Sequence, residues 1–156
     1  MAKVAVIMGS KSDMPVLQSG LDILDEFQVS YEVKVLSAHR TPKATISFAS
    51  SARKKGVKVI IAAAGGAAHL GGVVAAHTTL PVIGIPITTK SLAGIDSLFS
   101  TVQMPAGVPV ACMAIGEAGA KNAALFAIQV LALSDKRLEE KFKKYRDNLA
   151  KAVLKK

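Results

Sequence analysis

The sequence Ser37-Ala-His-Arg-Thr-Pro42 decides the fold class, because it joins an extended apolar run to a helical pattern. The apolar run occupies 31–36, and apolar residues with helical spacing begin near Thr41. In open α/β folds, a strand-to-helix junction places side chains at the carboxyl edge of a parallel sheet, where ligands bind. Thr41 is a natural helix cap and Pro42 suits a first helical turn, so we expect the helix to begin here.

Strand-like runs of this kind recur along the chain and alternate with helical patterns. They lie at 3–8, 31–36, 57–62, 80–85 and 110–113. The alternation predicts a flavodoxin-like α/β fold with three α/β/α layers, a five-stranded parallel sheet and an extra C-terminal helix. We expect a single domain over 1–156, with a doubly wound core at 1–133 and a basic amphipathic helix at 134–156.

The composition fits a domain with an aliphatic core. Hydrophobic residues make up 51% of the 156 residues but aromatic residues only 4%, as expected for a parallel sheet covered on both faces. The single cysteine excludes an internal disulfide and favours a reducing compartment. No apolar run approaches the roughly 20 residues that cross a bilayer. The N-terminus leads directly into a strand-like run, so we expect a cytoplasmic protein with no membrane partner.

The formal net charge of +9 raises the possibility of a nucleic-acid partner. Residues 135–156 hold nine Lys or Arg against four Asp or Glu, which places +5 of that charge on the last helical pattern. Its apolar residues share one face, so the charges are interpreted as the solvated face of a docked helix. Few aromatic residues are available to stack on bases, and we therefore expect no nucleic-acid partner.

Two loops after predicted strands carry groups that handle protons and anions. His39 can move a proton near neutral pH, and Arg40 can bind a phosphate or carboxylate with two parallel donors. Ser10 and Ser12 offer hydroxyls beside the free backbone N–H groups of a helix start. Asp13 would repel a phosphate and is better suited to cap a helix or to accept hydrogen bonds from sugar hydroxyls. The spacing matches neither a Walker loop nor G-x-G-x-x-G, so neither ATP nor NAD is predicted.

A third loop, at 63–72, surrounds one imidazole with small residues. Its four glycines and four alanines let the backbone approach a ligand closely and make the loop mobile. His69 is its only polar side chain, so we expect it to contact a ligand. His77 has no partner nearby in sequence and is expected to be exposed. Because parallel strands end at one edge, the three loops should together supply a phosphate clamp, a sugar-hydroxyl acceptor and two imidazoles.

The segment 116–133 is small and apolar almost throughout. A helix that is apolar on every side must be buried on every side. A domain of this size offers too little core for that, so we expect burial partly against another subunit. The sequence therefore predicts a homo-oligomer.

In the motifs of these three loops, the sequence resembles the class I N5-carboxyaminoimidazole ribonucleotide mutases of purine biosynthesis, the PurE family. The resemblance runs from Val4 to about Leu133 and rests on many ordered motifs. These are Gly9-Ser-Lys-Ser-Asp13, Ser37-Ala-His-Arg-Thr-Pro42, Gly65-Gly-Ala-Ala-His-Leu70, Leu80-Pro-Val-Ile-Gly84, Asp96-Ser-Leu98, Val102-Gln-Met-Pro105, Gly107-Val-Pro109, Ala114-Ile-Gly116 and Asn122-Ala-Ala-Leu125.

The resemblance implies an isomerase that moves the substrate's carbamate carboxyl from N5 of the aminoimidazole ribonucleotide to ring carbon C4, in IMP biosynthesis. It also implies an octamer with shared active sites and no metal or organic cofactor. His39 matches the catalytic proton-transfer residue. The matching substrate-binding positions are Ser10, Ser12 and Arg40 for the phosphate, Asp13 for the ribose, and Ser37, Ala38, His69 and Leu70 in the same pocket.

Other functions remain open at this point. A related carboxylase uses AIR and CO2, with Lys at the position of Arg40 and without the His-Leu of the third loop, so Arg40 and His69 favour the mutase. Gly71 stands where the family typically has Pro, and Ala63 where Gly is common. A non-catalytic flavin- or nucleotide-binding module is the alternative from another class, although no loop carries an aromatic residue to stack on a flavin.

Overall fold

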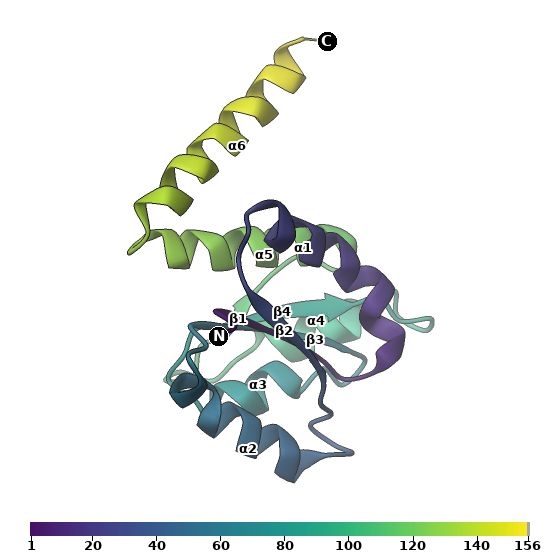
Figure 1. Cartoon of the computed structure of the whole chain (residues 1–156). Helices are drawn as coiled ribbons and strands as arrows, with labels where there is room; N and C mark the ends of the chain where they lie inside the picture. The colour runs from purple at the N-terminus through teal and green to yellow at the C-terminus, as the bar shows by residue number, and fades with distance from the viewer. Residues whose placement is uncertain (156) are drawn as a thin grey trace.

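A five-stranded parallel sheet forms the centre of the protein (Figure 1), described by a computed structural model over residues 1–155. Its strand order is β2-β1-β3-β4-β5, the flavodoxin-like order, which confirms the predicted fold class. Lys156, the last residue of the predicted C-terminal helix, lies outside the described residues. The strands are β1 (Val4–Met8), β2 (Tyr31–Val35), β3 (Val59–Gly65), β4 (Val82–Ile87) and β5 (Ala111–Cys112).

Both faces of the sheet are covered, which explains why β1 is apolar without interruption. Val4, Val6 and Met8 point into one core, and Ala5 and Ile7 point into the other. The first core is shared with α1 (Met14–Glu26) and α5 (Glu117–Ala132), and the second with α2 (Pro42–Ala52) and α3 (Leu70–Ala75). The face of α2 and α3 also carries α4 (Ile95–Val102), whose Thr101 packs over Gly84 of β4.

The second helix starts and stops close to where its sequence predicts. Pro42 is its first residue, and after a short 3-10 turn, η2 (Arg53–Lys55), Gly56 adopts a left-handed φ of 88°. Thr41 stands at the cap position but makes no capping bond, so that part of the prediction is wrong. Its hydroxyl instead accepts a hydrogen bond from the Ser37 N–H at 2.9 Å and lies 3.1 Å from the Ser37 carbonyl oxygen. Thr41 therefore fixes the preceding loop rather than the helix.

The glycine-rich segment is more ordered than its composition suggests. Pairing with β1 carries β3 to Ala63 and pairing with β4 carries it to Gly65, which lies opposite Ile87, and α3 already begins at Leu70. Only residues 66–69 remain as a loop, so the predicted loop over 63–72 is wrong in extent. Ala63 is fully buried in the strand, and Gly71 lies in the first turn of α3. The strand ladder and the helix start thus accommodate both departures from the family pattern.

The last two helices leave apolar surface uncovered. α6 (Lys136–Leu154) is capped by the carboxylate of the preceding Asp135, and it packs Phe142 and Tyr145 against Phe27. Beyond this contact α6 projects away from the body (Figure 1), and Val153 is 74% exposed. On α5 one face is buried, whereas Phe126 remains 38% exposed. The predicted burial of α5 on all sides is therefore not achieved within one chain.

Candidate functional site

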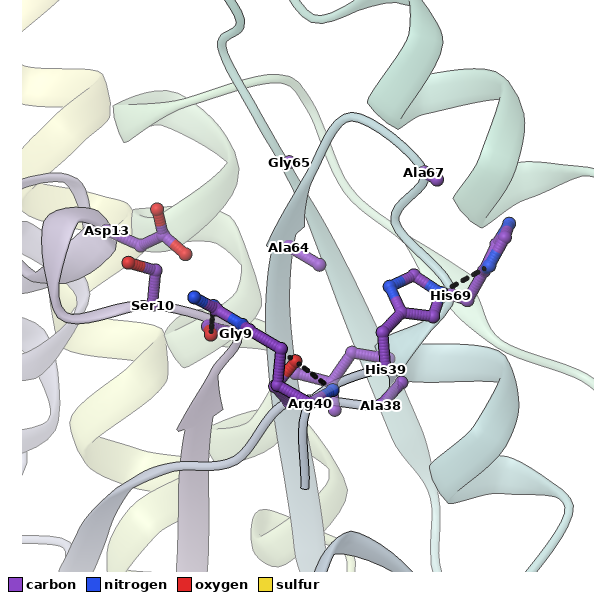
Figure 2. A pocket seen from close by; sticks show the side chains of 12 residues that line it. Gly9, Ser10, Asp13, Ala38, His39, Arg40, Ala64, Gly65, Ala67 and His69 are labelled. Carbon is purple, nitrogen blue, oxygen red and sulfur yellow. Dashed lines mark hydrogen bonds between the residues drawn. The ribbon is translucent and has the colours of Figure 1, made fainter. Parts of the chain in front are cut away.

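Three loops meet at the carboxyl edge of the sheet and line a cavity of about 200 Å³ (Figure 2). They follow β1, β2 and β3, as the junctions in the sequence predict. All predicted site residues except Ser12 line this cavity. Its lining consists of Gly9, Ser10, Asp13, Ser37, Ala38, His39, Arg40, Ala64, Gly65, Ala67, His69 and Leu70.

The loop after β1 presents the Ser10 hydroxyl from the start of the 3-10 turn η1 (Lys11–Asp13). Ser10 Oγ accepts hydrogen bonds from the backbone N–H of Ser12 at 3.3 Å and from its hydroxyl at 2.8 Å. Ser12 itself is exposed, and it does not line the cavity. In the free chain, Ser12 therefore orients a lining residue and does not reach the cavity.

Asp13 is a buried carboxylate at the same end of the cavity. It occupies the cap position of α1 without making a side-chain capping bond, and only 8% of the residue is exposed. Burial raises the pKa of the Asp13 carboxyl, while hydrogen bonds from Ser12 and the Ser10 backbone and the charge of Arg40 oppose that rise. Its acceptor capacity is thus directed to the cavity rather than to the helix.

Arg40 connects the first two loops. Its Nη2 donates to the carbonyl oxygen of Gly9 at 2.6 Å, and its backbone N–H donates to Ser37 Oγ at 3.1 Å. Figure 2 shows the guanidinium between Ser10 on one side and His39 on the other. A cation therefore stands between the hydroxyl end of the cavity and the imidazole end.

Two imidazoles contact each other at the other end of the cavity. Nε2 of His39 lies 2.8 Å from Nδ1 of His69, and the rings meet nearly at right angles, with an interplanar angle of 84°. A hydrogen bond between two ring nitrogens holds one proton, so one ring must accept while the other donates. The pair therefore carries at most one positive charge while the contact is formed, and a proton can pass between the rings.

The rest of the cavity wall is made of small residues without reactive groups. This part of the wall consists mainly of backbone and methyl groups, contributed by Gly9, Ala64, Gly65 and Ala67. In the sequence, only the small size of these residues indicates that they could lie close to a ligand. The third histidine, His77, is exposed as predicted, with Nδ1 2.8 Å from the carbonyl oxygen of Val73. It lies outside the site.

The family profile of AIR carboxylase matches residues 3–152, nearly the whole chain. The chain belongs to the AIR carboxylase family. Curated relatives of the chain carry the name N5-carboxyaminoimidazole ribonucleotide mutase, among them proteins of Bacillus subtilis and Saccharolobus solfataricus. The Bacillus subtilis protein is 56% identical over 151 residues, covering 97% of this chain and 93% of the relative. The Saccharolobus solfataricus protein is 55% identical over 154 residues, covering 99% and 96%.

Among solved structures, Treponema denticola PurE matches this member of the AIR carboxylase family with a TM-score of 0.87. The identity is 28%, over 97% of this chain and 94% of the Treponema chain. Within residues 1–155, no helix is both long and apolar enough to span a bilayer. Nor do three His, Cys, Asp or Glu side chains in that range gather as a metal site.

Proposed function

We propose that this chain is an N5-carboxyaminoimidazole ribonucleotide mutase, which forms 4-carboxyaminoimidazole ribonucleotide in purine (IMP) biosynthesis. The observation that carries the proposal is the pair of touching imidazoles, His39 and His69, in one cavity with a hydroxyl, a carboxylate and a guanidinium. The names of the Bacillus and Saccharolobus relatives, each more than half identical to this chain, support the same reaction.

The polar end of the cavity suits the ribose phosphate. Ser10 and Arg40 offer a hydroxyl and a cation to the phosphate, and Ser12 joins them once the ligand draws the loop together. Asp13 accepts hydrogen bonds from the ribose hydroxyls, which replace the water lost on burial. The aminoimidazole base then extends toward the imidazole end, between Ser37 and Ala38 on one side and His69 and Leu70 on the other.

His39 is the catalytic residue of the proposed reaction. The bond between N5 and the carboxyl carbon breaks, CO2 is released, and His39 supplies the proton that N5 gains. Ring carbon C4 then attacks CO2, and His39 removes the proton that C4 carried, so the proton count balances over the cycle. The contact with His69 gives His39 a partner that orients its ring beside the transferred carboxyl. Only proton transfer and CO2 are involved, so the mechanism calls for no cofactor.

The reaction also needs a cover over the site, because free CO2 would diffuse away. His39, Arg40 and His69 are all exposed in the single chain. A homo-oligomer, which we propose to be an octamer with shared sites, supplies that cover. The apolar side chains left exposed on and before α4 support this arrangement; they are Leu92, Ile95, Phe99 and Val102.

We further propose one mutase domain over 1–156, with the core at 1–133 and the basic helix at 134–156, acting in the cytoplasm on a small ribonucleotide. Neither nucleic acid nor a membrane is a partner in this proposal. The α6 cations accompany a stripe of apolar residues on the opposite face, and one of them pairs with an acid of its own helix, since Lys143 Nζ lies 2.7 Å from Glu139 Oε1.

A substrate comparison tests the proposed reaction. Purified protein is given either N5-carboxyaminoimidazole ribonucleotide or AIR with bicarbonate, and formation of the 4-carboxy product is followed. We expect turnover of the carbamate substrate, in keeping with Arg40 and His69 at the positions that separate the mutase from the carboxylase. Faster turnover of AIR with bicarbonate would identify a CO2-dependent carboxylase instead.

Two variants of adjacent residues test the assigned roles. We expect His39→Asn to abolish turnover while the nucleotide still binds, because the imidazole moves protons and the phosphate contacts remain. Arg40→Ala should weaken binding by about 1.5–3 kcal/mol, as expected for a charged hydrogen bond. Calorimetric titration with the product measures both affinities. An equal loss of binding in the two variants would mean that both residues maintain the fold and that the roles are misassigned.

A further inference from the structure

We propose that Ser97 of α4 is a positioning residue, which holds the loop at 66–69 so that His69 meets His39. Its side chain does not line the cavity, and it would act only through the backbone of Gly66. The inference rests on the proposed function, because part of its test is mutase turnover. It concerns the Asp96-Ser-Leu98 segment, to which the proposed chemistry assigns no role.

Ser97 links three segments with a single hydroxyl. The residue is fully buried, its Oγ donates to the carbonyl oxygen of Ile87 at 2.7 Å, and it accepts from the N–H of Gly66 at 2.9 Å. Both partners lie where strands end, since Gly65 and Ile87 form the last pair of β3 and β4. The hydroxyl therefore continues the sheet beyond its last backbone pair and fixes the first residue of the loop.

Gly66 is the corner from which the loop turns back. It has a left-handed φ of 67°, a conformation that side chains rarely adopt. Its carbonyl oxygen accepts from the Ala68 N–H at 2.8 Å, and the hydroxyl of Ser100 lies 3.3 Å away from it. Ser100 makes a shorter bond, 2.7 Å, to the carbonyl oxygen of Asp96. Of the two α4 residues that contact Gly66, Ser100 is therefore the one with the weaker contact.

The distance along the chain from this corner to the imidazole is short. Only two residues separate Gly66 from His69, whose N–H donates to the Ala67 carbonyl oxygen at 2.8 Å. The backbone carbonyl oxygen of His69 accepts a hydrogen bond from the Val73 N–H at 3.0 Å, in the first turn of α3. A tight loop between two fixed ends has few ways to absorb a shift. A displacement of Gly66 therefore changes the 2.8 Å contact between the two imidazoles.

The start of α4 is itself fixed, which makes the helix a suitable support. Thr89 Oγ1 donates to the Asp96 carboxylate at 2.8 Å and accepts from the Gly94 N–H at 3.2 Å. Gly94 allows no side chain, because a Cβ there would lie 2.7 Å from Ile115. Ser97 therefore lies on a helix whose first turn is fixed by the Thr89 hydrogen bonds and by the close packing at Gly94.

The test compares Ser97→Ala with Thr101→Val. Thr101 is also a buried α4 hydroxyl, but it donates to the Ser97 carbonyl oxygen at 2.8 Å and does not touch Gly66. For Ser97→Ala we expect kcat to fall on the order of 10- to 100-fold, as for a small misplacement of a reacting group. KM should stay within about twofold of the wild type, because the phosphate and ribose contacts are on other loops. Thr101→Val should keep the wild-type kcat.

A second measurement does not depend on turnover. The ring ¹⁵N chemical shifts of His39 and His69 in the free protein report the hydrogen bond between the two rings. We expect Ser97→Ala, but not Thr101→Val, to change these shifts. If the wild type fails to turn over the carbamate, the proposed function fails, and the ring shifts still decide whether Ser97 positions the loop.

A wild-type kcat together with wild-type ring shifts in Ser97→Ala would overturn the inference. If Ser97→Ala does not fold, Ser100→Ala takes its place, since it removes the second α4 contact with Gly66 from a partly exposed position. We then expect a smaller loss of kcat with KM unchanged. No loss of kcat and no change in ring shifts in Ser100→Ala would contradict the proposal equally.

Discussion

At the scale of single residues, the cavity holds groups that are costly for the free protein and useful only with a ligand. Asp13 is buried without a capping bond, and the exposed guanidinium of Arg40 bonds only a backbone carbonyl oxygen at its Nη2. The burial of Asp13 lowers stability in the empty state, because its charge is removed from water without full compensation. A ribonucleotide with hydroxyls and a phosphate would supply the missing partners.

Asp13→Asn tests this interpretation through pH. Because burial raises the folded-state pKa of Asp13 above the ordinary 3.8, the folded protein holds that proton more tightly than the unfolded chain. The wild type therefore loses stability as pH rises from 3.8 through the raised pKa, and the loss persists above it. We expect the variant to unfold at a higher temperature than the wild type at neutral pH, with the difference vanishing below pH 3.8.

Denaturation curves at several pH values measure the effect, with Asp147→Asn on the exposed part of α6 as the control. The control should change the free energy of unfolding by less than about 0.5 kcal/mol throughout. The same Asp13→Asn variant should bind the ribonucleotide more weakly. A variant less stable than the wild type at neutral pH would show that the Asp13 carboxylate stabilises the fold.

At the scale of elements, the sequence predicts what local pattern controls and misses what distant contacts control. The apolar runs of β1 and β4 and the Pro42 and Gly56 boundaries of the second helix follow from local rules. The end of β3 does not follow from them. Its small residues up to Gly65 have the composition of a loop, but pairing with β4 makes them part of the strand. The site residues at strand ends were predictable, because local strand-to-helix patterns place them at the carboxyl edge of the sheet. The exclusion of Ser12 from the cavity wall and the bond from Ser97 to Gly66 depend on side-chain geometry and contacts that no local pattern encodes.

The close crossing of α1 and α5 gives an element-scale prediction. A Cβ added at Gly20 would lie 2.6 Å from the carbonyl oxygen of Ala120, and this backbone atom cannot rotate away. Alanine gains up to about 1 kcal/mol in helix propensity, but separating the helices costs about 1–3 kcal/mol. We expect Gly20→Ala to lower the free energy of unfolding in denaturant titrations. Gln18→Ala, on the exposed side of the same helix, is the control, and a gain in stability for Gly20→Ala would refute the close packing.

At the scale of the whole molecule, the proposed homo-oligomer would account for both the uncovered apolar side chains and the open site. Phe99 is 61% exposed on α4, and Val153 is 74% exposed on the projecting α6 (Figure 1). The same helix α4 contacts the loop that carries His69. An assembly that covers α4 would therefore support the site as well as enclose it.

Light scattering at micromolar concentration tests the assembly. We expect a wild-type mass of several chains, and a lower mass with reduced turnover for Phe99→Asp, because a carboxylate cannot be buried in an apolar interface without a partner. Ser47→Asp adds the same charge on the exposed face of α2 and should keep the wild-type mass. A monomeric wild type with full turnover would remove the need for a cover from a second copy.

The measurement that tests the central claim most directly follows the carboxyl carbon itself. Purified protein receives N5-carboxyaminoimidazole ribonucleotide with ¹³C in the carbamate, in buffer containing unlabelled bicarbonate, and the product is analysed by mass spectrometry. We predict 4-carboxyaminoimidazole ribonucleotide that retains the ¹³C, because the proposed assembly would enclose the site and retain the released CO2, and no product with His39→Asn. Absence of product with the wild type, or product carrying only the isotope content of the bicarbonate, would contradict the account.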